Sequence, residues 1–182
     1  MSEKIKNFHQ SSIDSTDEFW AEQAKLIHWN SSFEQVLDYS NPPFAKWFVQ
    51  GKTNLCFNAI DRHLDERSDQ AAIVYVSTET NAEESISYKE LFQRVNSFSS
   101  LLSSCGVSKG DRVLIYMPMI PEAVYAMLAC VRIGAVHSVV FGGFASASLA
   151  QRVDDCSPKV MVTADAGLRG GRVIPYKGLV DE

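Results

Sequence analysis

The sequence predicts an α/β fold in which a helical, aromatic-rich N-terminal extension precedes the start of a doubly wound parallel sheet. First, apolar strands recur about every 24 residues in the second half of the chain, with helical segments between them. Second, these strands do not alternate with polar residues, which is typical of sheets covered on both faces. Third, the aromatic-rich segment before residue 50 shows no such alternation of strands and helices. We therefore expect two parts, residues 1–80 and residues 81–182.

Composition and charge restrict the class of protein. The chain has 182 residues, of which 46% are hydrophobic and 21% charged, an ordinary globular balance. Its formal net charge of -5 disfavours a nucleic acid or an anionic membrane surface as partner. The N-terminal MSEKIKNFHQSS lacks the apolar region of a secretory signal, and the longest apolar run, residues 123–131, is too short to span a membrane. We therefore expect a cytoplasmic protein.

Common catalytic and metal-binding motifs are absent from the sequence. It contains no G-x-S-x-G, H-E-x-x-H, EF-hand or Walker A pattern, and its four cysteines lack the spacing of a zinc site. The cysteines are therefore expected to be reduced thiols that behave as small hydrophobes. His137 lies within an apolar strand and is expected to be a core residue. We thus predict no catalytic residue and no metal ligand in this chain.

The extension is expected to contain two helices and one strand. Asp14 or Ser15 can cap a helix that runs to about His28. Residues 41–43 (NPP) break the chain, and apolar residues at helical spacing predict a second helix over 54–66. A β-branched run predicts a strand over 71–77. The aromatic stripe is expected to be a packing surface for another domain; a ligand-binding box is the alternative.

The second part contains clear signals for the starts and ends of helices. The sequence Ser87-Tyr88-Lys89-Glu90 is a capping box that opens a helix, which Gly106 ends as a left-handed cap. Alternating strands and helices are then expected, with Ser146 as the N-cap of the second helix. The expected strands are 112–116, 135–141 and 159–163, and the expected helices are 121–133 and 146–155.

Ligands of open α/β sheets bind beyond the carboxyl ends of the strands, so the loops that follow the strands carry the candidate sites. These loops are residues 117–121, 142–144 and 164–177. In the third, Arg169 and Arg172 flank two glycines. Guanidinium groups bind phosphate through paired hydrogen bonds, and glycines let backbone amides approach closely. The alternative is a surface loop whose arginines face water.

The second loop contains Gly142 and Gly143 directly after a buried strand. They permit close approach of the backbone to a ligand, or they serve a tight turn before the next helix. The pattern is not G-x-G-x-x-G, so the dinucleotide-binding fingerprint is absent.

Several stretches resemble the acetyl- and propionyl-CoA synthetases, a family of adenylate-forming (ANL) enzymes. Trp47-Phe48 and residues 53–63 (TNLCFNAIDRH) are similar to the N-terminal extension of the family. Residues 116–145 resemble the first half of its adenylating domain, and residues 158–182 resemble the propionate branch more than the acetate branch. The similarity covers nearly the whole chain after about residue 14. The part from residue 81 onward is therefore expected to be the first portion of a large adenylating domain.

The resemblance implies a two-step reaction. A short carboxylate attacks the α-phosphate of ATP, which is accompanied by Mg²⁺, to give an acyl-adenylate and pyrophosphate; the thiolate of CoA then displaces AMP. The expected partners are thus small molecules: propionate, or acetate as the alternative, with ATP and CoA. The resemblance further implies that the R-x-x-R segment holds the nucleotide end of CoA. The residues assigned to CoA are Arg169, Gly170, Gly171, Arg172, Gly142, Gly143 and Phe141.

Much of the family pattern is not matched in this sequence. The phosphate loop, the adenine-binding residues, the carboxylate pocket and the catalytic lysine of the C-terminal domain lie further along the chain in the family. We therefore expect the 182 residues to be an N-terminal fragment that does not catalyse adenylation alone. A catalytically inactive CoA-binding fragment, or a poorly folding remnant with an exposed sheet edge, is the alternative.

Overall fold

The computed structural model describes residues 2–143 and 145–182, which form two compact units, residues 1–54 and 55–182. This division falls earlier in the chain than residue 80, where the sequence suggests the change. The reason is that segments between residues 55 and 87 contribute to the core of the second unit. Cys56, Ile60 and Ile86 are all buried there with residues of the later helices. The start of the adenylating domain stays a prediction.

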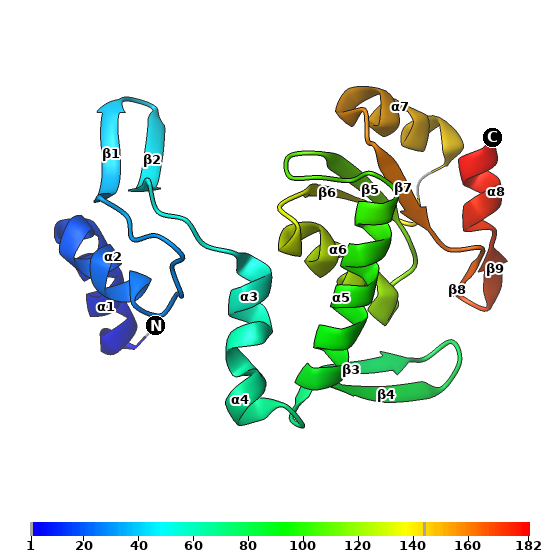
Figure 1. Ribbon diagram of the computed structural model, residues 1–182, viewed down its shortest axis with the longest axis horizontal. Coiled ribbons are helices and arrows are strands. Elements are labelled where there is room, and N and C mark those ends of the chain that lie inside the picture. The colour runs from blue at the N-terminus through cyan, green and yellow to red at the C-terminus, as the bar shows by residue number, and fades with distance from the viewer. Residues whose placement is uncertain (1, 144) are drawn as a thin grey trace. The chain divides into compact units, whose positions relative to one another are not determined.

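The first unit consists of two helices and a β-hairpin (Figure 1). The helices are α1 (Glu3–Asp14), which was not expected, and α2 (Thr16–Ala24). Ser15, one of the two expected caps, is the N-cap of α2, but the helix ends earlier than the expected His28. Strands β1 (Gln35–Asn41) and β2 (Phe44–Val49) pair in antiparallel fashion around the predicted break. Aromatic rings pack against one another within the unit: the rings of Trp29, Phe33 and Phe48 lie 5.1 to 5.3 Å apart. Some of the aromatic stripe is therefore internal packing.

The second unit begins with short helical turns and a hairpin. The expected helix over 54–66 is divided into α3 (Leu55–Ala59), the 3₁₀ turn η1 (Asp61–His63) and α4 (Leu64–Arg67). Strand β3 (Ala71–Ser77) confirms the predicted strand. It pairs with β4 (Ala82–Ser87), and the turn between them contains Glu79.

Helix α5 (Tyr88–Ser104) begins with the predicted capping box. The Glu90 amide donates to Ser87 Oγ at 3.2 Å, and the Ser87 amide donates to Glu90 Oε2 at 2.8 Å. Leu91, Val95 and Leu102 of this helix are buried. Gly106 follows the helix with a φ of 84°, which confirms it as a left-handed cap.

Replacing Ser87 with alanine is expected to lower the free energy of unfolding by about 1 kcal/mol, because the helix loses its side-chain cap. Urea denaturation followed by circular dichroism measures the change. Ser104→Ala, at the exposed end of the same helix, is the matched control. Equal stabilities of the two variants would contradict a stabilising cap at Ser87.

The second half of the unit is a parallel three-stranded sheet in the order β6-β5-β7. Its strands are β5 (Arg112–Tyr116), β6 (Val136–Val140) and β7 (Val160–Thr163). Helices α6 (Pro121–Arg132) and α7 (Ser146–Cys156) connect them, as expected from the sequence. One prediction was wrong: Ala145, not Ser146, is the N-cap of α7.

Strand β5 separates two cores. Val113 and Ile115 belong to a cluster with α5 and α6, whereas Leu114 and Tyr116 belong to a cluster with α7 and α8 (Tyr176–Asp181). Because side chains alternate along a strand, helices must cover both faces of this strand. Figure 1 shows these helices around the strands. The doubly wound arrangement is thus confirmed for β5, whereas Val136 and Val139 of the neighbouring β6 are exposed.

The third expected loop is not irregular. It contains the second hairpin of this unit, β8 (Gly167–Arg169) paired with β9 (Arg172–Ile174), before α8. None of the helices in the described parts of the chain is long and apolar enough to cross a membrane.

Candidate phosphate-binding site

The candidate site lies where the parallel strands end. Phe141, Gly142 and Gly143 follow β6, and the β8–β9 hairpin follows β7. Because parallel strands have their carboxyl ends at one edge, the topology brings both segments to the same edge. Phe144, which the expected second loop includes, lies outside the described residues.

The R-x-x-R segment forms the tip of the hairpin. Arg169 and Arg172 are directly paired across the ladder, and the two glycines between them have φ values of 58° and 72°. Positive φ at both central residues is the requirement of a two-residue type I′ turn, which glycine meets without strain. Since directly paired residues share one face of a hairpin, both arginine side chains start from the same face. Both arginines are exposed.

Arg169 is positioned by the loop after β6. Its guanidinium carbon lies 5.1 Å from the centre of the Phe141 ring, a cation–π distance. A Cβ atom added to Gly143 would lie 2.6 Å from Arg169 Nη1 and 2.5 Å from Phe141 Cε1. Gly143 therefore leaves the space that this stacked pair occupies. Its backbone φ is not positive, so close approach, not turn geometry, requires the glycine.

Gly142 makes a similar close approach to Tyr176, the first residue of α8. A Cβ atom at this position would overlap the tyrosine hydroxyl and lie 2.8 Å from Cζ. Tyr176 is buried, its ring centre lies 5.0 Å from that of Tyr116, and burial raises the pKa of its hydroxyl. The glycine thus allows α8 to pack against the end of β6.

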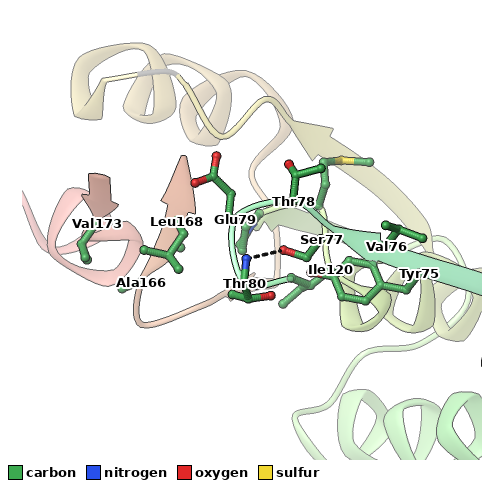
Figure 2. A pocket seen from close by; sticks show the side chains of 13 residues that line it. Tyr75, Val76, Ser77, Thr78, Glu79, Thr80, Ile120, Ala166, Leu168 and Val173 are labelled. Atoms are coloured by element: carbon green, nitrogen blue, oxygen red, sulfur yellow. Dashed lines mark hydrogen bonds between the residues drawn. The ribbon is translucent and has the colours of Figure 1, made fainter. Parts of the chain in front are cut away.

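These groups line a cavity of about 690 Å³. Arg169 and Phe141 contribute a cationic and an aromatic surface, and residues from β5, α6 and β6 contribute apolar surface. Glu79, from the β3–β4 turn, also lines this cavity and a neighbouring one of about 530 Å³. Figure 2 shows Glu79 among the residues that line the smaller cavity, near Leu168 of β8.

The structure therefore brings together most of the expected residues. Phe141, Gly143 and Arg169 are in mutual contact, and Arg172 is paired with Arg169. Two residues of the site were not expected from the sequence. Tyr176 is the first residue of a short helix, and Glu79 is an ordinary acidic turn residue 91 positions before Gly170, so neither carries a local signal.

A parallel sheet covered by helices on both faces of its central strand is the architecture of open α/β proteins, which bind ligands beyond the carboxyl ends of their strands. The chain belongs to the family of AMP-binding enzymes, whose sequence model matches residues 60–178. A second model, the acetyl-coenzyme A synthetase N-terminus, matches residues 5–59. The two models meet between α3 and η1, near the division between the compact units.

Named relatives support the same assignment. A propionate–CoA ligase of Escherichia coli (strain K12) is 56% identical over 98% of this chain, and an acetyl-coenzyme A synthetase of Methylorubrum populi is 48% identical over 98%. The chain spans 28% of the length of each. Among solved structures, an acetoacetyl-CoA synthetase from Streptomyces lividans has a TM-score of 0.88 at 31% identity, covering 95% of this chain and 27% of its own. The resemblance to acyl-CoA synthetases is thereby confirmed.

Proposed function

We propose that this chain is the N-terminal part of a cytoplasmic, ATP-dependent short-chain acyl-CoA synthetase that converts propionate to propionyl-CoA. Arg169 and Arg172, positioned by the adjoining glycine loops, would bind the phosphate-bearing nucleotide end of CoA. One observation carries the assignment: two arginines face each other across a two-glycine turn. Like charges at directly opposed positions destabilise a hairpin, and an anion bound between the two arginines would offset their repulsion.

The geometry suits a phosphate ligand. Each guanidinium can donate two parallel hydrogen bonds to phosphate oxygens. Stacking on Phe141 restricts Arg169, so less conformational entropy is lost when an anion binds. Phe141 and Gly143 thus act on the ligand through Arg169, while Gly142 keeps the end of β6 packed on Tyr176.

The full protein would use ATP, with Mg²⁺ neutralising its phosphates, and release AMP and pyrophosphate. We assign neither step to a residue of this chain. The substrate proposal rests on the resemblance to the propionate branch and on the identity of 56% to a propionate–CoA ligase, against 48% to an acetyl-coenzyme A synthetase. Acetate is the alternative substrate. Comparing kcat/KM for propionate and acetate in the full-length protein decides between the two.

Arg172→Ala is expected to raise the KM for CoA about tenfold, a loss of about 1.4 kcal/mol, and to change the KM for ATP much less. The reason is that the substitution removes one of two cationic phosphate ligands. Arg94→Ala, on the exposed surface of α5, removes the same charge away from the site and should change neither value. An unchanged KM for CoA in Arg172→Ala would contradict the assigned role.

The intact mass of the native protein, purified from its source through an N-terminal tag, tests the first half of the proposal. A species several times heavier than 20.2 kDa, with ligase activity, is expected. A stable species at 20.2 kDa would contradict ligase activity and leave CoA binding as the function to be measured.

A further inference from the structure

A carboxylate binds the tip of the β8–β9 hairpin. The Gly170 amide donates to Glu79 Oε1 at 2.6 Å, and the Gly171 amide donates to Glu79 Oε2 at 3.0 Å. Both oxygens of one carboxylate thus accept from successive amides, a charge-assisted arrangement that is stronger than neutral hydrogen bonds. Figure 2 shows Glu79 on the β3–β4 turn, beside the strand that carries Leu168.

This contact changes the role of the two glycines. Successive backbone amides in a turn can form a concave site that binds anions. The sequence suggested that these amides approach a phosphate, but the protein supplies its own anion to them. The side chains of Arg169 and Arg172, on the same turn, are then the groups left to meet an external phosphate.

We propose that Glu79 is a positioning residue for the CoA site: it holds the hairpin tip in place, so that Arg169 and Arg172 bind phosphate with their guanidinium groups while the glycine amides serve the structure. The proposal rests on the proposed function of the arginine pair.

The hairpin needs such support. Its strands have three residues each and pair only with each other in the described structure. A two-stranded hairpin of this size is marginal without further contacts. The β3–β4 hairpin is longer, and its turn is held by the Thr80 amide, which donates to Ser77 Oγ at 3.3 Å. The amides of Gly171 and Gly170 hold the pKa of Glu79 below its usual value, so the carboxylate stays charged at neutral pH.

The contact is tested first without ligand, by nuclear magnetic resonance of the 182-residue chain labelled with ¹⁵N-glycine. The chain has ten glycines, so the spectrum is simple. Glu79→Gln is expected to move the Gly170 and Gly171 amide protons upfield and to leave Gly106 and Gly134, whose amides donate to backbone carbonyls, in place. Glu83→Gln, which removes the same charge from the exposed neighbouring strand, should move neither. Unmoved Gly170 and Gly171 resonances in Glu79→Gln would overturn the proposal.

The functional role is tested in the full-length protein by the KM values for CoA and ATP. Glu79→Ala is expected to raise the KM for CoA about tenfold and the KM for ATP much less, a split that general destabilisation would not produce. Glu79→Asp, which keeps the charge, should recover part of the loss, and Glu83→Gln should change neither value. An unchanged KM for CoA would overturn the positioning role. A lower one would show that Glu79 competes with phosphate for the amides, which also overturns it. A parent protein that does not bind CoA would refute the proposed function itself, whatever the resonances of Gly170 and Gly171 show.

Discussion

Replacing Asp61 with alanine is expected to destabilise the second unit by about 3 kcal/mol, the range for breaking a largely buried ion pair. Both oxygens of Asp61 accept from the Arg132 guanidinium, at 2.9 and 2.7 Å, and the two side chains are only 18% and 19% exposed. The pair joins η1 to the end of α6, where Arg132 also lies 5.2 Å from the centre of the Phe92 ring. Removing the carboxylate leaves a positive charge in a poorly hydrated place, which is costly.

Denaturant unfolding measures this loss. Asp65→Ala removes an exposed carboxylate from the adjacent helix α4 and should change stability by less than about 0.5 kcal/mol. The double variant Asp61→Leu with Arg132→Met should recover much of the loss, because it removes the arginine charge together with its carboxylate. If Asp61→Ala unfolds at the same denaturant concentration as Asp65→Ala, the ion pair is not stabilising.

Replacing Gly142 with alanine should cost about 2 kcal/mol, because the new methyl group overlaps the buried ring of Tyr176. Either the tyrosine or the end of β6 must move, and each movement also disturbs the loop that carries Phe141. We therefore expect weaker CoA binding in the full-length protein as well as lower stability. Thermal and urea denaturation measure the stability, and calorimetry measures the binding.

Two further variants test whether steric overlap with Tyr176, and not the added methyl group as such, causes the loss of stability. Gly178→Ala, within helix α8, has its nearest neighbour at 3.5 Å and should stabilise the chain by about 0.5 kcal/mol, because alanine favours helices. Adding Tyr176→Phe to Gly142→Ala removes the overlapping hydroxyl and should restore part of the stability. Full stability of Gly142→Ala alone would show that the backbone adjusts without cost.

Local signals in the sequence were sufficient for most of the second unit. The capping box placed the start of α5 correctly, and uninterrupted apolar runs located β3 and β5 at their observed bounds. These signals involve residues that are near each other in sequence, so no tertiary contact is needed to read them. The parallel orientation of β5, β6 and β7 follows from the alternation of strands and helices, because a helix between two strands leaves no short connection for antiparallel pairing.

The errors occur where tertiary contacts decide the structure. The predicted break at residues 41–43 is the turn between β1 and β2, but the sequence does not predict the two strands, because their pairing depends on cross-strand contacts. The expected helix over 54–66 is interrupted at Ile60, which is fully buried and leaves the helical backbone region. For the site, the arginines and glycines were recognisable from composition, but their partners Tyr176 and Glu79 were not. Both partners act through contacts with distant residues.

The four glycines of the site are required for two different physical reasons. At Gly142 and Gly143 the limit is volume, since any side chain would meet neighbouring atoms. At Gly170 and Gly171 there is nothing within 4 Å of an added Cβ, and the limit is the positive φ alone. Residues of the opposite chirality prefer positive φ. The hairpin tip therefore excludes ordinary side chains by handedness, and a mirror-image amino acid could occupy it where its natural counterpart is strained.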